Sequence, residues 1–240
     1  MATSPTVSSL TVPGLTVPRR LGAALAAVVV GMSACGSDDA ATPDTTATPD
    51  TTATATTDPD CPPIGGAAER TREFDQAPPT CLEPDASYEA VVTTNTGEFT
   101  IAIDPETAPV AANNFVFLAR NQYFDDTVCH RIIPNFVVQC GDPTATGTGG
   151  PGYTIVDEPP AVPYQIGSVA MAKTASPDSA GSQFFIVTGS DGAALPPEYA
   201  LFGQVVDGFD TTVAQMAAAG TPSGEPAETV AIQSIRVVQQ

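Results

Sequence analysis

The sequence predicts a mainly β domain over residues 88–240, folded as a closed antiparallel barrel with two helices. Most of this region consists of short apolar stretches separated by turn residues, and only two stretches have the periodicity of a helix. Short strands that follow one another without intervening helices favour antiparallel pairing over a parallel βαβ arrangement. Roughly 150 residues are also enough to bury one hydrophobic core.

Two strands and a helix come first. Residues 88–93 and 98–103 flank a turn at 95–97, and apolar residues alternate with Thr and Ala in the second stretch, as in a half-buried strand. A helix is expected from Pro109 to Arg120, because apolar residues recur there every three or four positions and proline suits the first turn.

A hairpin is expected next, with strands at 128–133 and 136–139. Pro134 and Asn135 between them fit the central positions of a type II turn. Three further strands are expected at 168–172, 184–187 and 201–206. A helix at 209–219 ends before a glycine, and a last strand is expected at 230–238.

The first 35 residues resemble an export signal. Two arginines precede an apolar run at 21–32, and small residues lead to Cys35. The run is too short to cross a bilayer, which requires about 20 apolar residues. A cysteine at this point resembles a bacterial lipoprotein signal, so we expect lipid on Cys35 and an extracytoplasmic domain anchored to the bacterial cell membrane. The alternatives are a plain cleaved signal, which would give a secreted protein, and an uncleaved anchor.

Residues 36–60 consist mainly of Thr, Ala, Pro and Asp, without a large apolar side chain. Such a segment cannot bury enough surface to offset the entropy of ordering, so a disordered tether is expected. Residues 61–87 are rich in proline and predict an irregular extension strapped by Cys61 and Cys81. The net charge of −19 argues against nucleic acid or anionic lipid headgroups as partners.

The chain has five cysteines, and four remain if Cys35 carries lipid. An even number in an exported protein favours disulfides. Three pairings are possible, and proximity in the sequence favours Cys61–Cys81 and Cys129–Cys140. Zinc is disfavoured because the chain has one histidine and no Cys-x-x-Cys pair, so we expect no metal and no cofactor.

The hairpin register bears on the second disulfide. A two-residue turn would pair Ile133 with Phe136 and put Cys129 opposite Cys140. The same register would point Arg131 and Gln139 to opposite faces of the hairpin, so that only a bulge or a strong twist would bring them together.

Arg131 is the one cation of a long apolar region. An unpaired charge is very costly to bury, so this side chain must have a partner or face a groove. Taken alone, Arg131 would suit a salt bridge on the barrel surface better than a catalytic role. Its neighbours change that balance, because they resemble the conserved blocks of one family, the cyclophilins. The blocks occur in the order and approximate spacing of that family: His130–Phe136, Gln139–Asp142, Gly147–Gly150, Ala170–Ala172, Gly181–Phe185 and Phe202-Gly203.

The resemblance covers about residues 88–238 and implies an eight-stranded barrel capped by two helices. It also implies a peptidyl-prolyl cis/trans isomerase that acts without a cofactor on proline-containing peptides and unfolded exported proteins, as a monomer. Rotation about an X–Pro bond crosses a barrier of about 18–20 kcal/mol, and no covalent step is needed. A fixed guanidinium that donates to the pyramidal amide nitrogen would stabilise the twisted state selectively.

Each family role is transferred to a matching position. Arg131 would be the catalytic donor, oriented by Gln139. The proline pocket would be lined by Phe136, Val137, Phe185 and Leu195. The peptide chain would be bound by Gln183 and by the backbone around Ala172 and Lys173. Tyr199 would hydrogen-bond near the prolyl carbonyl, and His130 would flank the site. Core packing is the alternative role for Phe136 and Phe185, and a structural role is favoured for His130.

The chain departs from the family pattern at several positions. Ala194 stands where many cyclophilins carry a tryptophan that contacts cyclosporin, so weak inhibition by that drug is expected. Val137 replaces a frequent methionine, Lys173 replaces asparagine, and Tyr199 replaces histidine. Cys140 replaces a glycine beside Gln139. None of these changes removes the arginine, so activity is expected to survive.

Other chemistries are poorly supported. No serine lies in a Gly-x-Ser-x-Gly turn, which disfavours a hydrolase, and the glycine-rich stretch 146–150 lacks the Gly-Lys-Ser/Thr ending of a phosphate loop. The remaining alternative is a catalytically weak peptide-binding or chaperone module that uses the same groove. The presence of both Arg131 and Gln139 favours the enzyme.

Overall fold

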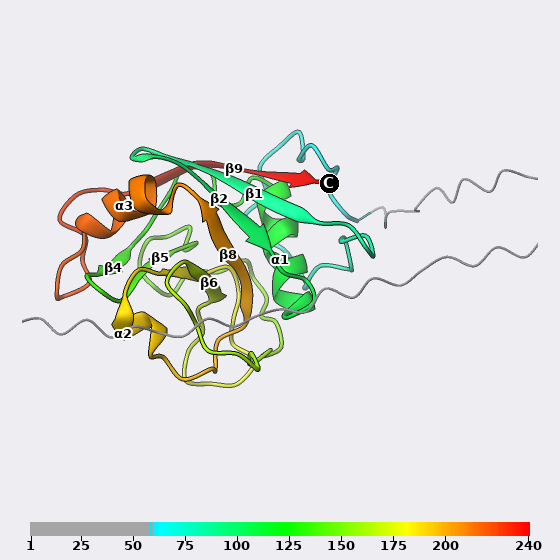
Figure 1. Ribbon diagram of the computed structural model, residues 1–240. Helices are drawn as coiled ribbons and strands as arrows, with labels where there is room; N and C mark the ends of the chain where they lie inside the picture. Colours follow the sequence, from blue (N-terminus) through cyan, green and yellow to red (C-terminus); the bar gives the residue numbers. More distant parts are fainter. Residues whose placement is uncertain (1–57, 59) are drawn as a thin grey trace, which may run out of the picture. The chain divides into compact units, whose positions relative to one another are not determined.

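The computed structural model describes Asp58 and residues 60–240, and the expected signal peptide, with Cys35, and most of the tether lie outside these residues. The described part is built on an antiparallel sheet of nine strands (Figure 1). They are β1 (Tyr88–Thr94), β2 (Gly97–Ile103), β3 (Thr127–Val128), β4 (Arg131–Ile133), β5 (Val137–Cys140), β6 (Ser168–Met171), β7 (Phe184–Val187), β8 (Leu201–Asp207) and β9 (Ala231–Gln239).

The strand order is β3-β9-β1-β2-β8-β6-β7-β5-β4, which describes an open, curled sheet. The predicted closed barrel of eight strands is therefore wrong. The expected strand at 128–133 is divided at Cys129 and His130, so that β3 pairs with β9 at one end of the sheet and β4 pairs with β5 at the other. Two isolated bridges in the described residues, Val128 with Asp142 and Ile155 with Ala180, lie outside these strand pairs. Local alternation could not reveal this division, because both halves are extended.

Three short helical segments accompany the sheet, besides one long helix. Helix α1 (Pro109–Arg120) has the predicted bounds and begins with proline in its first turn. Its side chains are buried from Ala111 to Arg120, against β8 and β9 among others. Helix α2 (Ser190–Ala193) was not predicted.

The second expected helix, 209–219, is shorter and irregular. It begins as a π-helical turn, η1 (Phe209–Val213), and continues as α3 (Ala214–Ala218). Thr212 donates its hydroxyl to the Glu98 carbonyl oxygen at 2.7 Å. This tertiary bond, in a run of β-branched residues with low helix propensity, accompanies the departure from a regular α-helix.

Aromatic rings fill the centre of the main core. Phe115 of α1 lies between Phe124, Phe184 and Phe202, with ring centroids 4.9 to 5.3 Å apart. A second, smaller cluster lies at the other face of β6 and β7 and includes Val137. The two faces of these strands are thus both buried, one in the core and one beneath the candidate site.

The proline-rich extension folds onto the domain as an irregular segment. A disulfide joins Cys61 to Cys81, which confirms that predicted pair. The extension, cyan in Figure 1, runs beside the end of α1, where Ala67 donates its N–H to the Arg120 carbonyl oxygen at 2.7 Å. Among the residues that the structure describes, no helix is long and apolar enough to cross a membrane.

Candidate active site

The β4–β5 hairpin positions the two central side chains. Phe136 donates its N–H to the Ile133 carbonyl oxygen at 3.2 Å, and Asn135 has a φ of 58°, as position three of a type II turn requires. The hairpin loop nevertheless has three residues, because Ile133 pairs with Val137 and not with Phe136. The expected two-residue register is therefore wrong.

The observed register pairs Arg131 directly with Gln139. Directly opposed residues project to the same face of a sheet, so no bulge is needed to bring the two side chains together. The Nη1 atom of Arg131 donates to Oε1 of Gln139 at 3.1 Å. A change of one residue in the loop thus decides whether the guanidinium has its partner.

A disulfide between Cys129 and Cys140 ties the hairpin together, as the sequence predicted. The Cα atoms are 3.9 Å apart, and both side chains are almost completely buried. The observed register, which the Val128–Asp142 bridge continues, offsets Cys129 from Cys140 by one residue, so the two cysteines are not directly opposed. The pairing prediction was therefore correct although its register argument was not.

Hydrogen bonds continue from Arg131 across the sheet. Gln139 donates its Nε2 to Oε1 of Gln183 at 3.0 Å, and Gln183 donates its own Nε2 to the Gly149 carbonyl oxygen at 3.0 Å. Each amide is oriented by its donor and acceptor, so the oxygen of Gln139 faces Arg131. The Arg131 guanidinium carbon also lies 5.4 Å from the centre of the Phe136 ring.

These side chains border a cavity of about 150 Å³. Val137 and Phe185 are nearly fully buried and form apolar lining, while Arg131 supplies a fixed positive charge. Nine of the eleven residues predicted for the site line this one cavity: Arg131, Phe136, Val137, Gln139, Ala172, Lys173, Phe185, Leu195 and Tyr199. A small apolar cavity with a few converging polar groups is typical of a ligand site.

The other two predicted residues lie elsewhere. Gln183 lines a second hollow beside the cavity and is connected to the cavity by its hydrogen bond with Gln139. His130 is not part of the cavity lining. Its Nδ1 is buried without a partner, and burial lowers the pKa of His130, an effect that nearby Asp142 partly offsets. The half-buried histidine therefore lies beside the cavity and not in its lining, and the structural role expected for it stays a prediction.

Tyr164 supports the cavity and was not predicted. It donates its hydroxyl to the Tyr199 carbonyl oxygen at 2.7 Å and accepts the Tyr199 N–H at 2.8 Å. Burial raises the pKa of Tyr164 to about 12, so the hydroxyl keeps its proton. The Phe185 ring packs edge-on against Tyr199, with centroids 5.5 Å apart. Nothing near Tyr164 in the sequence indicates this long-range contact.

A second groove section, of about 320 Å³, adjoins the cavity at Gln139, Ala172 and Lys173. Its outer wall is the loop 147–153, which the buried carboxylate of Asp142 organises. Asp142 accepts the N–H groups of residues 144, 146, 147 and 149 and the hydroxyl of Thr144. Burial alone would raise the pKa of Asp142, but these donors outweigh it and lower that pKa to about 2.

Lys173 is paired and does not present a free charge to the groove. Its Nζ lies 2.6 Å from Oδ2 of Asp157. Hydrogen bonding to Lys173 lowers the pKa of Asp157, and the same bond raises the pKa of Lys173. The charge that Lys173 brings in place of asparagine is therefore balanced by a carboxylate sixteen residues earlier in the chain.

Comparison with known proteins identifies the fold. The family model described as "Cyclophilin type peptidyl-prolyl cis-trans isomerase/CLD" matches residues 90–237. A solved cyclophilin type peptidyl-prolyl cis-trans isomerase from Cryptosporidium parvum superposes with a TM-score of 0.59 at 32% identity, covering 64% of this chain and 99% of that one. The same Cryptosporidium protein solved in the presence of the dipeptide Ala-Pro gives a TM-score of 0.58 at 33% identity, covering 63% and 99%.

Curated relatives have similar names. The probable peptidyl-prolyl cis-trans isomerase B of Mycobacterium leprae is 36% identical over 173 residues, which are 63% of this chain and 57% of the relative. The chain thus spans little more than half of that protein. The peptidyl-prolyl cis-trans isomerase-like 1 of Gibberella zeae is 38% identical over 155 residues, 62% of this chain and 94% of the relative. The region matched by the family model contains every residue of the Arg131 cavity. The chain therefore belongs to the cyclophilin-type peptidyl-prolyl cis-trans isomerase family.

Proposed function

We propose that the chain is a peptidyl-prolyl cis/trans isomerase that acts on X–Pro bonds of exported polypeptides. The observation that carries this proposal is the fixed guanidinium of Arg131 beside a small apolar cavity, hydrogen-bonded to Gln139 at 3.1 Å. The reaction requires no nucleophile and no proton transfer, only selective stabilisation of a twisted amide.

The geometry supports a simple mechanism. The proline ring enters the cavity between Phe136, Val137 and Phe185, and the amide before it lies at the cavity mouth near Arg131. As the amide twists, its nitrogen loses conjugation and becomes a better hydrogen-bond acceptor. The guanidinium, already held by Gln139, donates to that nitrogen more strongly in the transition state than in the planar ground state. The bond then relaxes to either isomer.

The relatives support the substrate class. The Cryptosporidium parvum neighbour was solved in the presence of Ala-Pro, and the first relatives bear isomerase names. Proline-containing peptides are therefore proposed as substrates of this chain as well. We also assign Phe136, Val137, Phe185 and Leu195 to the prolyl ring, and Gln183, Ala172 and Lys173 to the peptide chain.

The decisive experiment is a protease-coupled assay of a short X-Pro peptide with Arg131→Ala beside the unmodified protein. Removing one transition-state donor is expected to lower kcat/KM by about 100- to 1000-fold. Arg236→Ala, which removes an exposed arginine of β9, is the matched control for loss of charge and should keep full activity. A folded Arg131→Ala protein as fast as the original would reject the mechanism. No acceleration by the folded original protein would point to a peptide-binding module.

We further propose that residues 1–35 direct export, that Cys35 carries lipid, and that residues 36–60 tether a monomeric extracytoplasmic domain to the membrane. The support is the pattern of arginines, apolar run and small residues before Cys35. Expression of the full chain and of Cys35→Ser in a bacterial host, followed by fractionation, tests this. The original should sediment with membranes and Cys35→Ser should not; equal partitioning of both proteins would contradict lipidation.

A further inference from the structure

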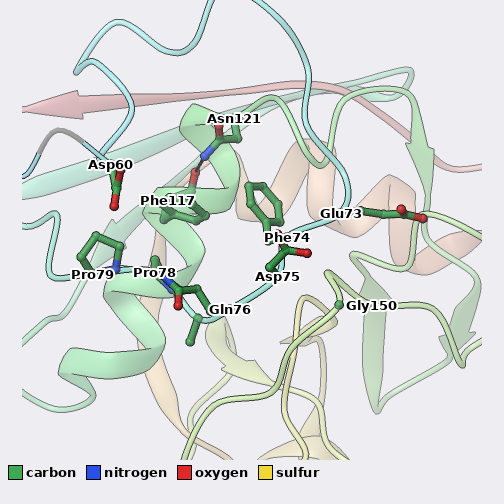
Figure 2. A pocket seen from close by; sticks show the side chains of 12 residues that line it. Asp60, Glu73, Phe74, Asp75, Gln76, Pro78, Pro79, Phe117, Asn121 and Gly150 are labelled. Carbon is green, nitrogen blue, oxygen red and sulfur yellow. Dashed lines mark hydrogen bonds between the residues drawn. The ribbon is translucent and has the colours of Figure 1, made fainter.

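The extension before β1 reaches the wall of the peptide groove, although it lies outside the residues that match the family model. Phe74, near its middle, donates its N–H to the Pro151 carbonyl oxygen at 2.9 Å. Its ring packs against Phe117 of α1, with centroids 5.1 Å apart, and against Tyr153, at 6.2 Å. Figure 2 shows Phe74 beside Phe117 in a cleft of about 960 Å³, with Gly150 on the neighbouring loop.

The loop approaches Phe74 closely from its own side. Gly152 has a φ of 99°, and a Cβ placed there would lie 2.5 Å from the Phe74 carbonyl oxygen. A side chain at this position would therefore force the loop and the extension apart. The two segments thus meet through the backbone N–H of Phe74, through its ring and at Gly152, where no Cβ intervenes.

The extension is attached to α1 independently of this loop. Cys81, bonded to Cys61, donates its N–H to Oδ1 of Asn113 at 2.7 Å, and Asn113 donates its Nδ2 to the Pro79 carbonyl oxygen at 2.8 Å. The segment that carries Phe74 is thus held at its end by a helix of the main core. This attachment limits the movement of the segment that carries Phe74, and hence of the loop that Phe74 contacts.

The loop in turn supports the groove. Residues 147–151 and Tyr153 line the section of about 320 Å³. The Gly149 carbonyl oxygen orients Gln183, which accepts a hydrogen bond from Gln139 beside Arg131. Tyr153 donates its hydroxyl to Asn114, whose Nδ2 donates to the Gly181 carbonyl oxygen at 2.7 Å, so the same loop is linked to the segment before β7. Displacement of the loop would loosen the groove wall while Arg131 stayed on its strand.

We propose that Phe74 is a positioning residue for substrate binding, and that the Cys61–Cys81 extension acts as a brace for the groove loop 147–153. This inference rests on the proposed isomerase function. It assigns to residues outside the family match a role in how tightly the peptide binds on the side of the groove away from the prolyl cavity. The brace acts on peptide affinity, whereas Arg131 acts on the rate of the bound complex.

The test compares Phe74→Ala, Phe74→Leu and Gly152→Ala with Gly65→Ala as a matched control. Gly65 lies in the same extension with no atom near its would-be Cβ. KM and kcat are measured with a peptide that has three residues before its proline, and the Kd of that peptide is measured by calorimetry. Loss of about one hydrogen bond in the groove should raise KM and Kd by about three- to tenfold. The value of kcat should stay within about twofold, as expected when only binding is weakened.

Phe74→Leu keeps an apolar side chain and covers the case in which Phe74→Ala does not fold. Unchanged KM and Kd in any folded Phe74 variant would overturn the brace. A merely stabilising role for Phe74 would lower the unfolding temperature and leave KM unchanged, which also overturns it. If the unmodified protein binds the peptide without isomerising it, the proposed function fails separately and the Kd values still decide the role of Phe74.

Discussion

The two sections of the groove, the Arg131 cavity and the section beside loop 147–153, are formed by different kinds of structural element. The Arg131 cavity takes its central residues from paired strands, namely Arg131, Val137, Gln139 and Phe185, and the rest of its lining from turns and loops. Arg131 and Gln139 are directly opposed in one ladder. The adjoining section is walled by the backbone of loop 147–153, which depends on one buried carboxylate, Asp142, and on the extension. Strand ladders fix side chains within fractions of an ångström, whereas a loop keeps its shape only while its few anchors persist.

Because of this difference, we expect the strand side to determine the rate of isomerisation and the loop side to determine the affinity for the peptide. A group that must meet a twisted amide gains from a rigid ladder, because small displacements of a catalytic donor cost much of its effect. A wall that contacts the extended peptide tolerates more movement and can vary with the sequence that it binds. Changes on the strand side should therefore alter kcat, and changes on the loop side should alter KM and stability.

Apart from the loss of Arg131 itself, the largest effect is expected on the strand side, from Gln139→Leu. The substitution keeps the size of the side chain but removes the acceptor of Arg131 and the donor to Gln183. Hydrogen bonds to charged groups contribute about 1.5–3 kcal/mol, so kcat/KM should fall by roughly 10- to 100-fold, mainly in kcat. Steady-state kinetics of the X-Pro peptide measure this.

Gln204→Leu on β8 is the matched control, since it removes a half-buried glutamine amide that hydrogen-bonds far from the cavity. Its kcat should remain within about twofold of the original. If Gln139→Leu changed KM alone, the division between a catalytic strand side and a binding loop side would fail.

An intermediate effect is expected on the loop side, from Asp142→Asn. The carboxylate accepts five hydrogen bonds, and its pKa is lowered from 3.8 to about 2 in the folded protein. Because the folded pKa lies below the unfolded one, this stabilisation is complete above about pH 4 and is lost as the pH falls toward 2. The shift corresponds to roughly 2 kcal/mol in the free energy of unfolding.

Denaturant unfolding of both proteins between pH 7 and pH 2 measures this dependence. The free energies of unfolding should differ by about 2 kcal/mol at pH 7, and the difference should shrink toward zero at pH 2. Asp207→Asn, at an exposed carboxylate at the end of β8, should leave stability within about 0.5 kcal/mol. A pH-independent difference would show that the Asp142 charge is not what holds the loop.

The smallest effect is expected where the two sections meet, from Lys173→Asn. Its ion pair with Asp157 is partly exposed, and such pairs contribute little to stability. Stability and kcat should therefore change little, and KM should change by less than about threefold. Asp157→Asn should reproduce this result, and the effects of the two changes should be nearly additive in a double-mutant cycle. A tenfold change in KM would instead show that the Lys173 side chain, and not only the backbone beside it, contacts the peptide.

Much of the cavity could be predicted because its residues lie in short blocks with the family's spacing. Arg131, Phe136 and Gln139 come from one hairpin, so their proximity follows from local sequence. Tyr164 and Asp157 could not be found in this way, because each reaches its partner across the fold. The predicted hairpin register was wrong because a type II turn fits both a two-residue and a three-residue loop, so the turn sequence alone does not fix how the two strands pair.

By itself, the sequence determined the family, the bounds of helix α1 and most of the groups that line the Arg131 cavity, and it favoured the two disulfide pairs that the structure contains. These features depend on local pattern, on residue chemistry or on closeness along the chain. Only the tertiary structure decided that the sheet is open with nine strands, that Arg131 faces Gln139, and that Phe74 contacts the groove loop. Strand partners and long-range contacts are selected by the packing of the whole core, which no short segment specifies alone.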